Sequence, residues 1–189
     1  MDKQIAIDNL KVFRDILNKY GIAWWLDGGT CLGAIREHDF IAWDDDTDIG
    51  VLEETWNEAA KDEILKAGFQ LEMTYGTREK GYQYAFKRNG VKVDIFFYYL
   101  VGDKRWYAMY FMKRMIPMTY PSYIHAEQKV INFLGSNFNI PLKVEDYLIT
   151  KYGKDYMIPI DPEEWIWYCG PKNIDLNFNP ETYKPVTLS

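Results

Sequence analysis

The sequence predicts one domain of the α+β class, in which a mixed β-sheet is flanked by helices. The chain has 189 residues, a length that suits one compact core better than two ordinary enzyme domains. Helical and strand-like patterns follow one another without the strict strand–helix–strand alternation of a doubly wound sheet. No internal repeat or low-complexity segment indicates a solenoid or a disordered arm.

The first predicted elements are an amphipathic helix and a short strand. Apolar residues at spacings of 4, 3, 4 and 3 form one helical stripe, and Gly21 can end that helix. These residues are Ala6, Leu10, Phe13, Leu17 and Tyr20. Residues 22–26 form an apolar run of strand length, which Asp27-Gly28-Gly29 stops with a tight turn.

Turn-forming and periodic residues predict the next elements. A helix begins near Thr30, a residue type that caps helices well, and a later apolar stripe ends at Gly68. Asn89-Gly90 is a strong β-hairpin signal. In chain order we expect a helix over 30–37, a strand over 49–52, a helix over 53–66, and strands over 69–75, 82–88 and 91–97.

Beyond residue 100 the periodicity is weaker. Residues 106–123 are rich in aromatic residues and Met. Residues 106–118 have two interpretations: a core helix or strand with a basic rim, and a surface that touches a membrane. A further helix is expected over 144–152, ended by Gly153. The last twenty residues predict an irregular tail.

Charge and cysteine content narrow the function classes. The formal net charge of −6 disfavours a nucleic-acid partner, because phosphate binding needs clustered Lys and Arg. Cys31 and Cys169 cannot form a disulfide scaffold, and His38 and His125 offer no zinc spacing. We therefore expect a reducing, cytoplasmic environment.

No apolar segment of the sequence predicts a secretion signal or a membrane span. The N-terminal residues lack a long apolar run. No stretch reaches the roughly 20 apolar residues that cross a bilayer, and residues 106–118 are interrupted by Lys113, Arg114 and Pro117. The expected location is the cytoplasm, with at most peripheral contact at the inner face of the membrane.

An acidic cluster is the first candidate site. On a strand, Asp44, Asp46 and Asp48 would project to one side, because side chains alternate with period 2. Carboxylates that close resist ionising together unless a cation neutralises them, and their hard oxygens suit Mg²⁺ or Mn²⁺. An equally good interpretation of an isolated D-x-D is a solvated acidic loop.

The glycine turn upstream is the second candidate. Gly28, Gly29 and Thr30 can present backbone N–H groups and a helix N-terminus to a phosphate. Arg36 could clamp a phosphate oxygen. The alternatives are an ordinary strand-to-helix turn and a surface arginine.

Asp94 is a candidate third carboxylate. Alternation along residues 91–97 places Lys92, Asp94 and Phe96 on one face of the strand. In phosphoryl transfer such a residue can complete a metal site or accept the proton of an attacking hydroxyl. The alternative is a surface Asp.

Two runs carry a family resemblance: LDGGTCLGAIR over residues 26–36 and FIAWDDDTDIG over residues 40–50. Together with VDIFF over 93–97 and the C-terminal segments up to Gly153, they strongly resemble the LicD/fukutin family. The resemblance implies a nucleotidyltransferase fold with a DNA-polymerase-β-like core. It also implies a single transferase domain over 1–189, with the core over 1–100 and an acceptor-side extension and tail over 101–189.

The resemblance also implies roles for individual residues. Asp46 and Asp48 match the metal-binding D-x-D pair, and Asp94 matches the third acidic residue. The turn of Gly28, Gly29 and Thr30 matches the phosphate-contacting turn. Further matches to the substrate-binding motif are Asp27, Arg36 and Asp44.

The implied activity is transfer of a phosphorylated alcohol from a CDP-activated donor to a sugar hydroxyl of a glycan or lipid-linked glycan. The group is phosphocholine-like, a polyol phosphate or an aminoalkylphosphonate; CMP leaves, and Mg²⁺ or Mn²⁺ is the implied cofactor. The abundant Trp and Tyr could stack on a sugar or cage a quaternary ammonium, or form core. Two alternatives are a D-x-D sugar-nucleotide glycosyltransferase and a catalytically silent glycan-binding module.

Overall fold

The computed structural model describes residues 1–111, 114–161 and 171–182. The helices are α1 (Lys3–Lys19), α2 (Gly28–Arg36), α3 (Glu58–Lys66) and α4 (Val144–Tyr152). The strands are β1 (Trp24–Leu26), β2 (Asp46–Leu52), β3 (Gln70–Gly76), β4 (Tyr82–Arg88), β5 (Val91–Val101), β6 (Lys104–Phe111), β7 (Arg114–Pro121), β8 (Gln128–Phe133) and β9 (Ser136–Pro141). Short 3₁₀ helices cover Glu53–Thr55, Arg78–Lys80 and Ser122–His125.

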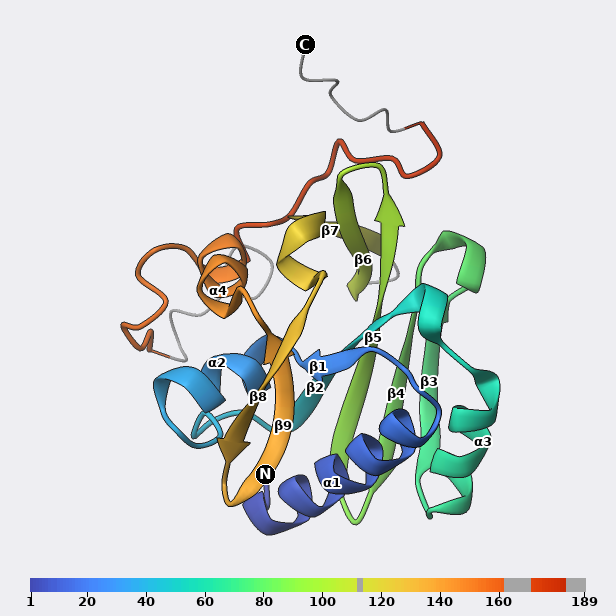
Figure 1. The fold of residues 1–189 in the computed structure, drawn as a ribbon, viewed down its shortest axis with the longest axis vertical. Coiled ribbons are helices and arrows are strands. Elements are labelled where there is room, and N and C mark those ends of the chain that lie inside the picture. The colour runs from blue at the N-terminus through green and yellow to red at the C-terminus, as the bar shows by residue number, and fades with distance from the viewer. Residues whose placement is uncertain (112–113, 162–170, 183–189) are drawn as a thin grey trace.

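A mixed sheet organises the domain and confirms the predicted α+β class. Its strand order is β1-β2-β5-β4-β3, and β5 also pairs with β6, which pairs with β7. The β2–β5 pair is parallel, whereas the other pairs of this sheet are antiparallel. In Figure 1, α1 crosses in front of the lower part of β4 and β5, α3 lies at the β3 edge, and α2 and α4 lie on the side of β1 and β2. Sheet pairing continues across position 100, the boundary between core and extension that the resemblance implies.

The first helix forms as its sequence pattern predicts. The Asp2 side chain accepts a hydrogen bond from the Ile5 backbone N–H at 3.0 Å, which satisfies a free donor of the first turn. Of the predicted stripe, the residues that are buried are Ala6, Leu10, Phe13 and Leu17. Gly21 follows the helix with φ of +65°, a conformation that glycine adopts at little cost.

Two helix starts were predicted wrongly. The helix expected from residue 53 begins at Glu58, because the Asn57 side chain accepts the Ala59 N–H at 2.9 Å and caps it there. Trp56 has an extended backbone and is buried. It was counted in the helical stripe, but it lies in the connection before α3. The helix expected from residue 30 begins at Gly28, with Asp27 at the N-cap.

The weak pattern beyond residue 100 is β structure. Residues 106–118 belong to the β6–β7 pair, in which Trp106, Tyr107 and Met118 are buried; the predicted basic rim at Lys113 lies outside the described residues. The β8–β9 hairpin was not predicted, since its turn residues Leu134 and Gly135 follow a strand without alternation. Residues 171–182 are irregular, apart from a bridge between Met118 and Ile174, and Cys169 is not described.

Within the described residues, none of the helices combines the length and the apolar character that crossing a bilayer requires.

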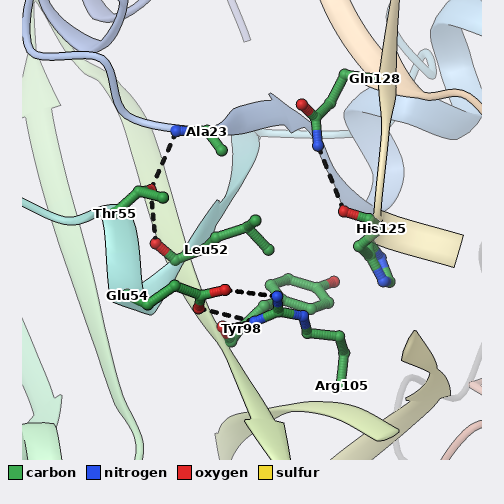
Figure 2. Close-up of polar contacts among 8 residues, drawn as sticks. All are labelled: Ala23, Leu52, Glu54, Thr55, Tyr98, Arg105, His125 and Gln128. Carbon is green, nitrogen blue, oxygen red and sulfur yellow. Dashed lines mark hydrogen bonds and ion pairs between the residues drawn. The ribbon is translucent and has the colours of Figure 1, made fainter. Parts of the chain in front are cut away.

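A buried histidine lies at the centre of an aromatic cluster. His125 is fully buried, and its ring centroid lies 4.7–4.8 Å from those of Trp25, Tyr98 and Tyr120. Neither ring nitrogen has a hydrogen-bond partner among the described residues. Figure 2 shows His125 near Tyr98, and Arg105 nearby, which binds the Glu54 carboxylate with two nitrogens at 2.7 and 2.5 Å. Burial and the positive charges of Arg105 and Lys151 hold the pKa of His125 well below its usual 6.5.

This burial predicts sensitivity to acid. Folded His125 stays neutral while the unfolded chain binds a proton below pH 6.5, so His125 costs stability as the pH falls below that value, by up to about 1.4 kcal/mol per pH unit. We expect His125→Phe to reduce the loss of unfolding free energy between pH 7 and pH 5 in urea titrations. His38→Asn, which changes an exposed histidine, should leave that loss unchanged. Equal pH slopes for wild type and His125→Phe would contradict the prediction.

Candidate functional site

A cavity of about 930 Å³ opens where the N-terminus of α2 meets β2, β5 and α4. Its acidic wall consists of Asp44, Asp46, Asp48 and Asp94. Apolar and aromatic side chains from other elements line much of the remainder: Leu32, Ile41, Trp43, Met73, Tyr75, Phe96, Tyr107, Met109, Tyr110, Tyr152, Tyr156, Ile158 and Ile160. A concave apolar site with a few convergent charged groups is typical of small-molecule binding.

Parallel pairing of β2 with β5 brings three carboxylates together. In this register Asp46 lies opposite Lys92, and Asp48 lies opposite Asp94. One carboxylate oxygen each of Asp46, Asp48 and Asp94 lies within 4.8 Å of the others. The three side chains could therefore hold one divalent cation between them. Asp44 and exposed Asp45 form a second such group with Asp46.

Asp94 is a buried member of this cluster, with a side chain that uses one of its two oxygens. Its Oδ2 lies 3.3 Å from Lys92 Nζ and accepts a hydrogen bond from Gln83 Nε2 at 3.4 Å. Its Oδ1 is buried and has no hydrogen-bond partner among the residues that the structure describes. Burial raises the pKa of Asp94 to about 6, although Lys92 opposes the rise. An unpartnered buried oxygen beside two carboxylates is what a metal ligand or proton acceptor requires.

Asp44 and Asp48 are also disfavoured as anions. Burial, followed by the charge of Asp46, raises the pKa of Asp44 to about 7. The same two causes and the charge of Asp44 raise the pKa of Asp48 well above its usual value. A divalent cation would relieve this repulsion, so the donor set fits Mg²⁺ or Mn²⁺.

The glycine turn is shaped by these carboxylates. Gly28 has φ of +48°, and a Cβ on it would lie 2.2 Å from Asp48 Oδ2; a Cβ on Gly29 would lie 2.5 Å from Asp44 Oδ2. The N–H groups expected to face a phosphate are engaged within the protein. That of Gly29 donates to Asp48 Oδ2 at 3.0 Å, and that of Gly28 donates to the Tyr147 hydroxyl at 2.9 Å.

Two residues expected at the substrate face the interior instead. Asp27 is fully buried and accepts hydrogen bonds from the hydroxyls of Tyr98, at 3.0 and 2.9 Å, and of Tyr147. Thr30 is also buried, and its hydroxyl accepts the Asp48 N–H at 2.9 Å. Neither lines the cavity, and their hydrogen bonds connect β2, α2, β5 and α4.

Arg36 lies at the cavity wall and not on the open surface. Its side chain is 7% exposed; Nη1 donates to the Tyr156 carbonyl at 3.1 Å and Nε lies 2.8 Å from Glu37 Oε1. These contacts tie the segment after α4 to the end of α2.

Sequence reasoning missed Lys92 and Lys151, two of the three lysines that line the cavity. Lys92 Nζ lies 2.7 Å from Asp46 Oδ2 and 3.3 Å from Asp94 Oδ2; strand alternation placed it on the face of Asp94 without suggesting this bridge. Lys151 lines the cavity from α4 and is buried. Within that helix it is a single basic residue in the last turn, where a solvated lysine is the usual expectation.

The chain belongs to the LicD/FKTN/FKRP family, since the model of that family's nucleotidyltransferase domain matches residues 21–143, more than half of the chain. The matched residues include Asp46, Asp48 and Asp94 of the acidic wall.

Curated relatives carry transferase names. "Ribitol-5-phosphate transferase FKTN" is 27% identical in Macaca fascicularis and 26% identical in Homo sapiens, each over 93% of this chain and 38% of the relative. "Lipopolysaccharide cholinephosphotransferase LicD" of Haemophilus influenzae is 42% identical over 45 residues, which is 24% of this chain and 17% of the relative. The chain thus spans well under half the length of these relatives.

Among solved structures, the lincosamide antibiotic adenylyltransferase LnuA with bound lincomycin is similar, with a TM-score of 0.49 and 14% identity over 71% of this chain and 78% of that one.

Crowding at the turn predicts a specific effect of adding one methyl group. Gly28→Ala should lose more unfolding free energy than Gly21→Ala, since both positions have positive φ but a Cβ at Gly21 meets nothing within 4 Å. The backbone cost common to both is about 1–2 kcal/mol. Only Gly28→Ala should also weaken Mn²⁺ binding, because it displaces Asp48. Urea unfolding and Mn²⁺ calorimetry measure the two effects, and indistinguishable variants would contradict this geometry.

The lysine bridge predicts a cation-dependent stability. Without divalent cations, Lys92→Met should lower the unfolding free energy by about 1–2 kcal/mol, between the values for exposed and buried pairs, because Asp46 and Asp94 lose their counter-charge. Added Mn²⁺ should restore more stability in this variant than in wild type. The control is Lys87→Met, which removes an exposed pair with Glu72. A Lys92→Met protein as stable as the control in EDTA would be evidence against the bridge.

Proposed function

We propose that this chain transfers a phosphorylated alcohol from a CDP-activated donor to a sugar hydroxyl of a cell-surface glycan, with release of CMP. The observation that carries the proposal is the group of Asp46, Asp48 and Asp94, with its unpartnered oxygen on Asp94, at the wall of a large cavity. The names of its relatives, ribitol-phosphate and choline-phosphate transferases, support the class of transferred group.

Asp46 and Asp48, together with Asp94, would hold Mg²⁺ or Mn²⁺ in this proposal. The cation would supply neutralisation of the donor's pyrophosphate oxygens and of the charge that develops on the departing phosphate. The residues fit such a group because their oxygens converge within 4.8 Å and burial disfavours the uncompensated anions of Asp48 and Asp94.

The chain's own residues would guide the acceptor. The oxygen of the sugar hydroxyl would attack the phosphorus that bears the alcohol, and the bond from that phosphorus to the CMP oxygen would break. Asp94 Oδ1, free of other partners in the described structure, would orient the hydroxyl and take its proton. The N–H group of Gly29 would hold Asp48 in place during this exchange.

The aromatic wall suits the acceptor. Tyr75 and Tyr110 both line the cavity and stack on each other with ring centroids 5.8 Å apart. Flat apolar faces of this kind pack well on sugar rings. We propose a glycan or lipid-linked glycan as acceptor, on the cytoplasmic side with at most peripheral membrane contact, and no nucleic-acid partner.

Removing a metal carboxylate should abolish turnover with little loss of fold. We expect Asp46→Asn to lower the transfer rate by at least about 10²-fold, the scale of losing one electrostatic stabiliser of a transition state, while its unfolding free energy stays close to that of wild type because repulsion is relieved. Asp62→Asn is the matched control, since Asp62 is exposed and lies outside both the carboxylate groups and the cavity lining. Full activity of Asp46→Asn would contradict the assignment of Asp46 as a metal ligand.

Nucleotide release tests the reaction class. Purified protein with Mg²⁺ or Mn²⁺ is offered CDP-alcohols, a CDP-aminoalkylphosphonate and sugar nucleotides, with Asp46→Asn as the blank. CMP from one CDP compound supports the proposal and names the donor. A nucleoside diphosphate from a sugar nucleotide would indicate glycosyl transfer, and no metal or nucleotide binding at all would indicate a silent glycan-binding module.

A further inference from the structure

A buried lysine on α4 shares the cavity with the acidic wall. The Lys151 side chain comes from the last turn of the helix, is 7% exposed, and lines the cavity together with Tyr107 and Tyr152. Its positive charge also acts on the carboxylate group of the acidic wall, since it opposes the rise of the pKa of Asp48. The lysine therefore lies where a ligand bound at the acidic wall would extend.

The ammonium group has no carboxylate partner in the part of the chain that the structure describes. Its nearest ring contacts are the faces of Tyr107 at 5.3 Å and of Tyr147 and Tyr152 at 5.9 Å. Other buried charges of the domain are paired: Arg105 with Glu54, and Asp27 with two tyrosine hydroxyls. Lys151 differs from them because its immediate neighbours are tyrosines, of which Tyr107 shares a hydrogen bond with it, and no carboxylate.

A buried ammonium without a carboxylate partner is costly, and a tyrosine hydroxyl and aromatic faces offset only part of that cost. Burial lowers the pKa of Lys151, but the neighbouring Tyr107 and the carboxylate of Asp27 outweigh it, so the group remains charged at neutral pH. A bound anion would provide the missing partner. Phosphate oxygens fit best, because they are anionic and can bind both an ammonium group and a divalent cation held at the acidic wall.

We propose that Lys151 forms a phosphate-binding subsite of the cavity, which holds an oxygen of the donor's diphosphate on the side away from the acidic wall. This inference rests on the proposed function only for the identity of the ligand; the subsite itself is for a diphosphate group. Lys151 is then a positioning residue that aligns the donor between a metal-bearing wall and a fixed positive charge. The same charge disfavours a donor whose cationic headgroup lies beside α4.

The test measures binding and not turnover. Inorganic pyrophosphate and CDP are titrated calorimetrically, with excess Mg²⁺, into wild type, Lys151→Met and Lys151→Gln. We expect both variants to bind pyrophosphate about 10- to 100-fold more weakly, the range for losing one hydrogen bond to a charged group. Lys172→Met is the matched control, because Lys172 lines the same cavity but is exposed, and its effect should stay below about threefold.

Each outcome is informative because folding and metal binding are measured separately, by circular dichroism and by Mn²⁺ titration. Folded Lys151 variants that bind pyrophosphate as tightly as wild type would overturn the subsite and leave Lys151 a structural cation. A wild type that binds Mn²⁺ but neither pyrophosphate nor CDP would also overturn it. Lysine-dependent pyrophosphate binding without release of CMP from any donor would support the subsite and contradict the proposed function instead.

Discussion

The repulsion among carboxylates on two neighbouring parallel strands is the constraint on which the rest of the site depends. Asp48 lies directly opposite Asp94, and Asp46 lies one alternation away on the same face. Such a group is tolerated because the surrounding protein supplies partial compensation: a backbone N–H from Gly29 and the ammonium of Lys92. Each compensating group comes from an element that the carboxylates in turn hold in place.

The glycines of the turn show this dependence in steric form. The carboxylates of Asp48 and Asp44 occupy the space that a Cβ at Gly28 or Gly29 would need. The close approach of α2 to these carboxylates therefore requires glycine at both positions. Behind the turn, the Asp27 carboxylate accepts hydrogen bonds from two tyrosine hydroxyls, one on β5 and one on α4. The acidic wall and the elements around it are therefore connected through one short segment of chain.

Local patterns predicted the elements whose signals lie within a few residues. The stripe of α1, the Asn89-Gly90 turn and the alternation that groups Lys92 with Asp94 are such signals, and they agree with the structure. The register of β2 against β5 joins residues 46 apart and has no local signature. For that reason three features could not be predicted: the ion pair of Lys92 with Asp46, the burial of Asp27, and the position of Lys151 in the cavity lining. Asn57 was a local signal that a longer apolar stripe concealed.

The parallel pairing of β2 and β5 also has a consequence for how the chain folds. Asp46 and Asp94 become neighbours only after the intervening segment, with α3, β3 and β4, has been accommodated, so the pair is among the long-range contacts that slow folding. The carboxylate repulsion can arise only where β5 comes to lie beside β2, and it opposes that approach. A cation available at that moment would favour closure, so the ionic composition around the nascent chain can influence the rate at which this domain reaches its native state.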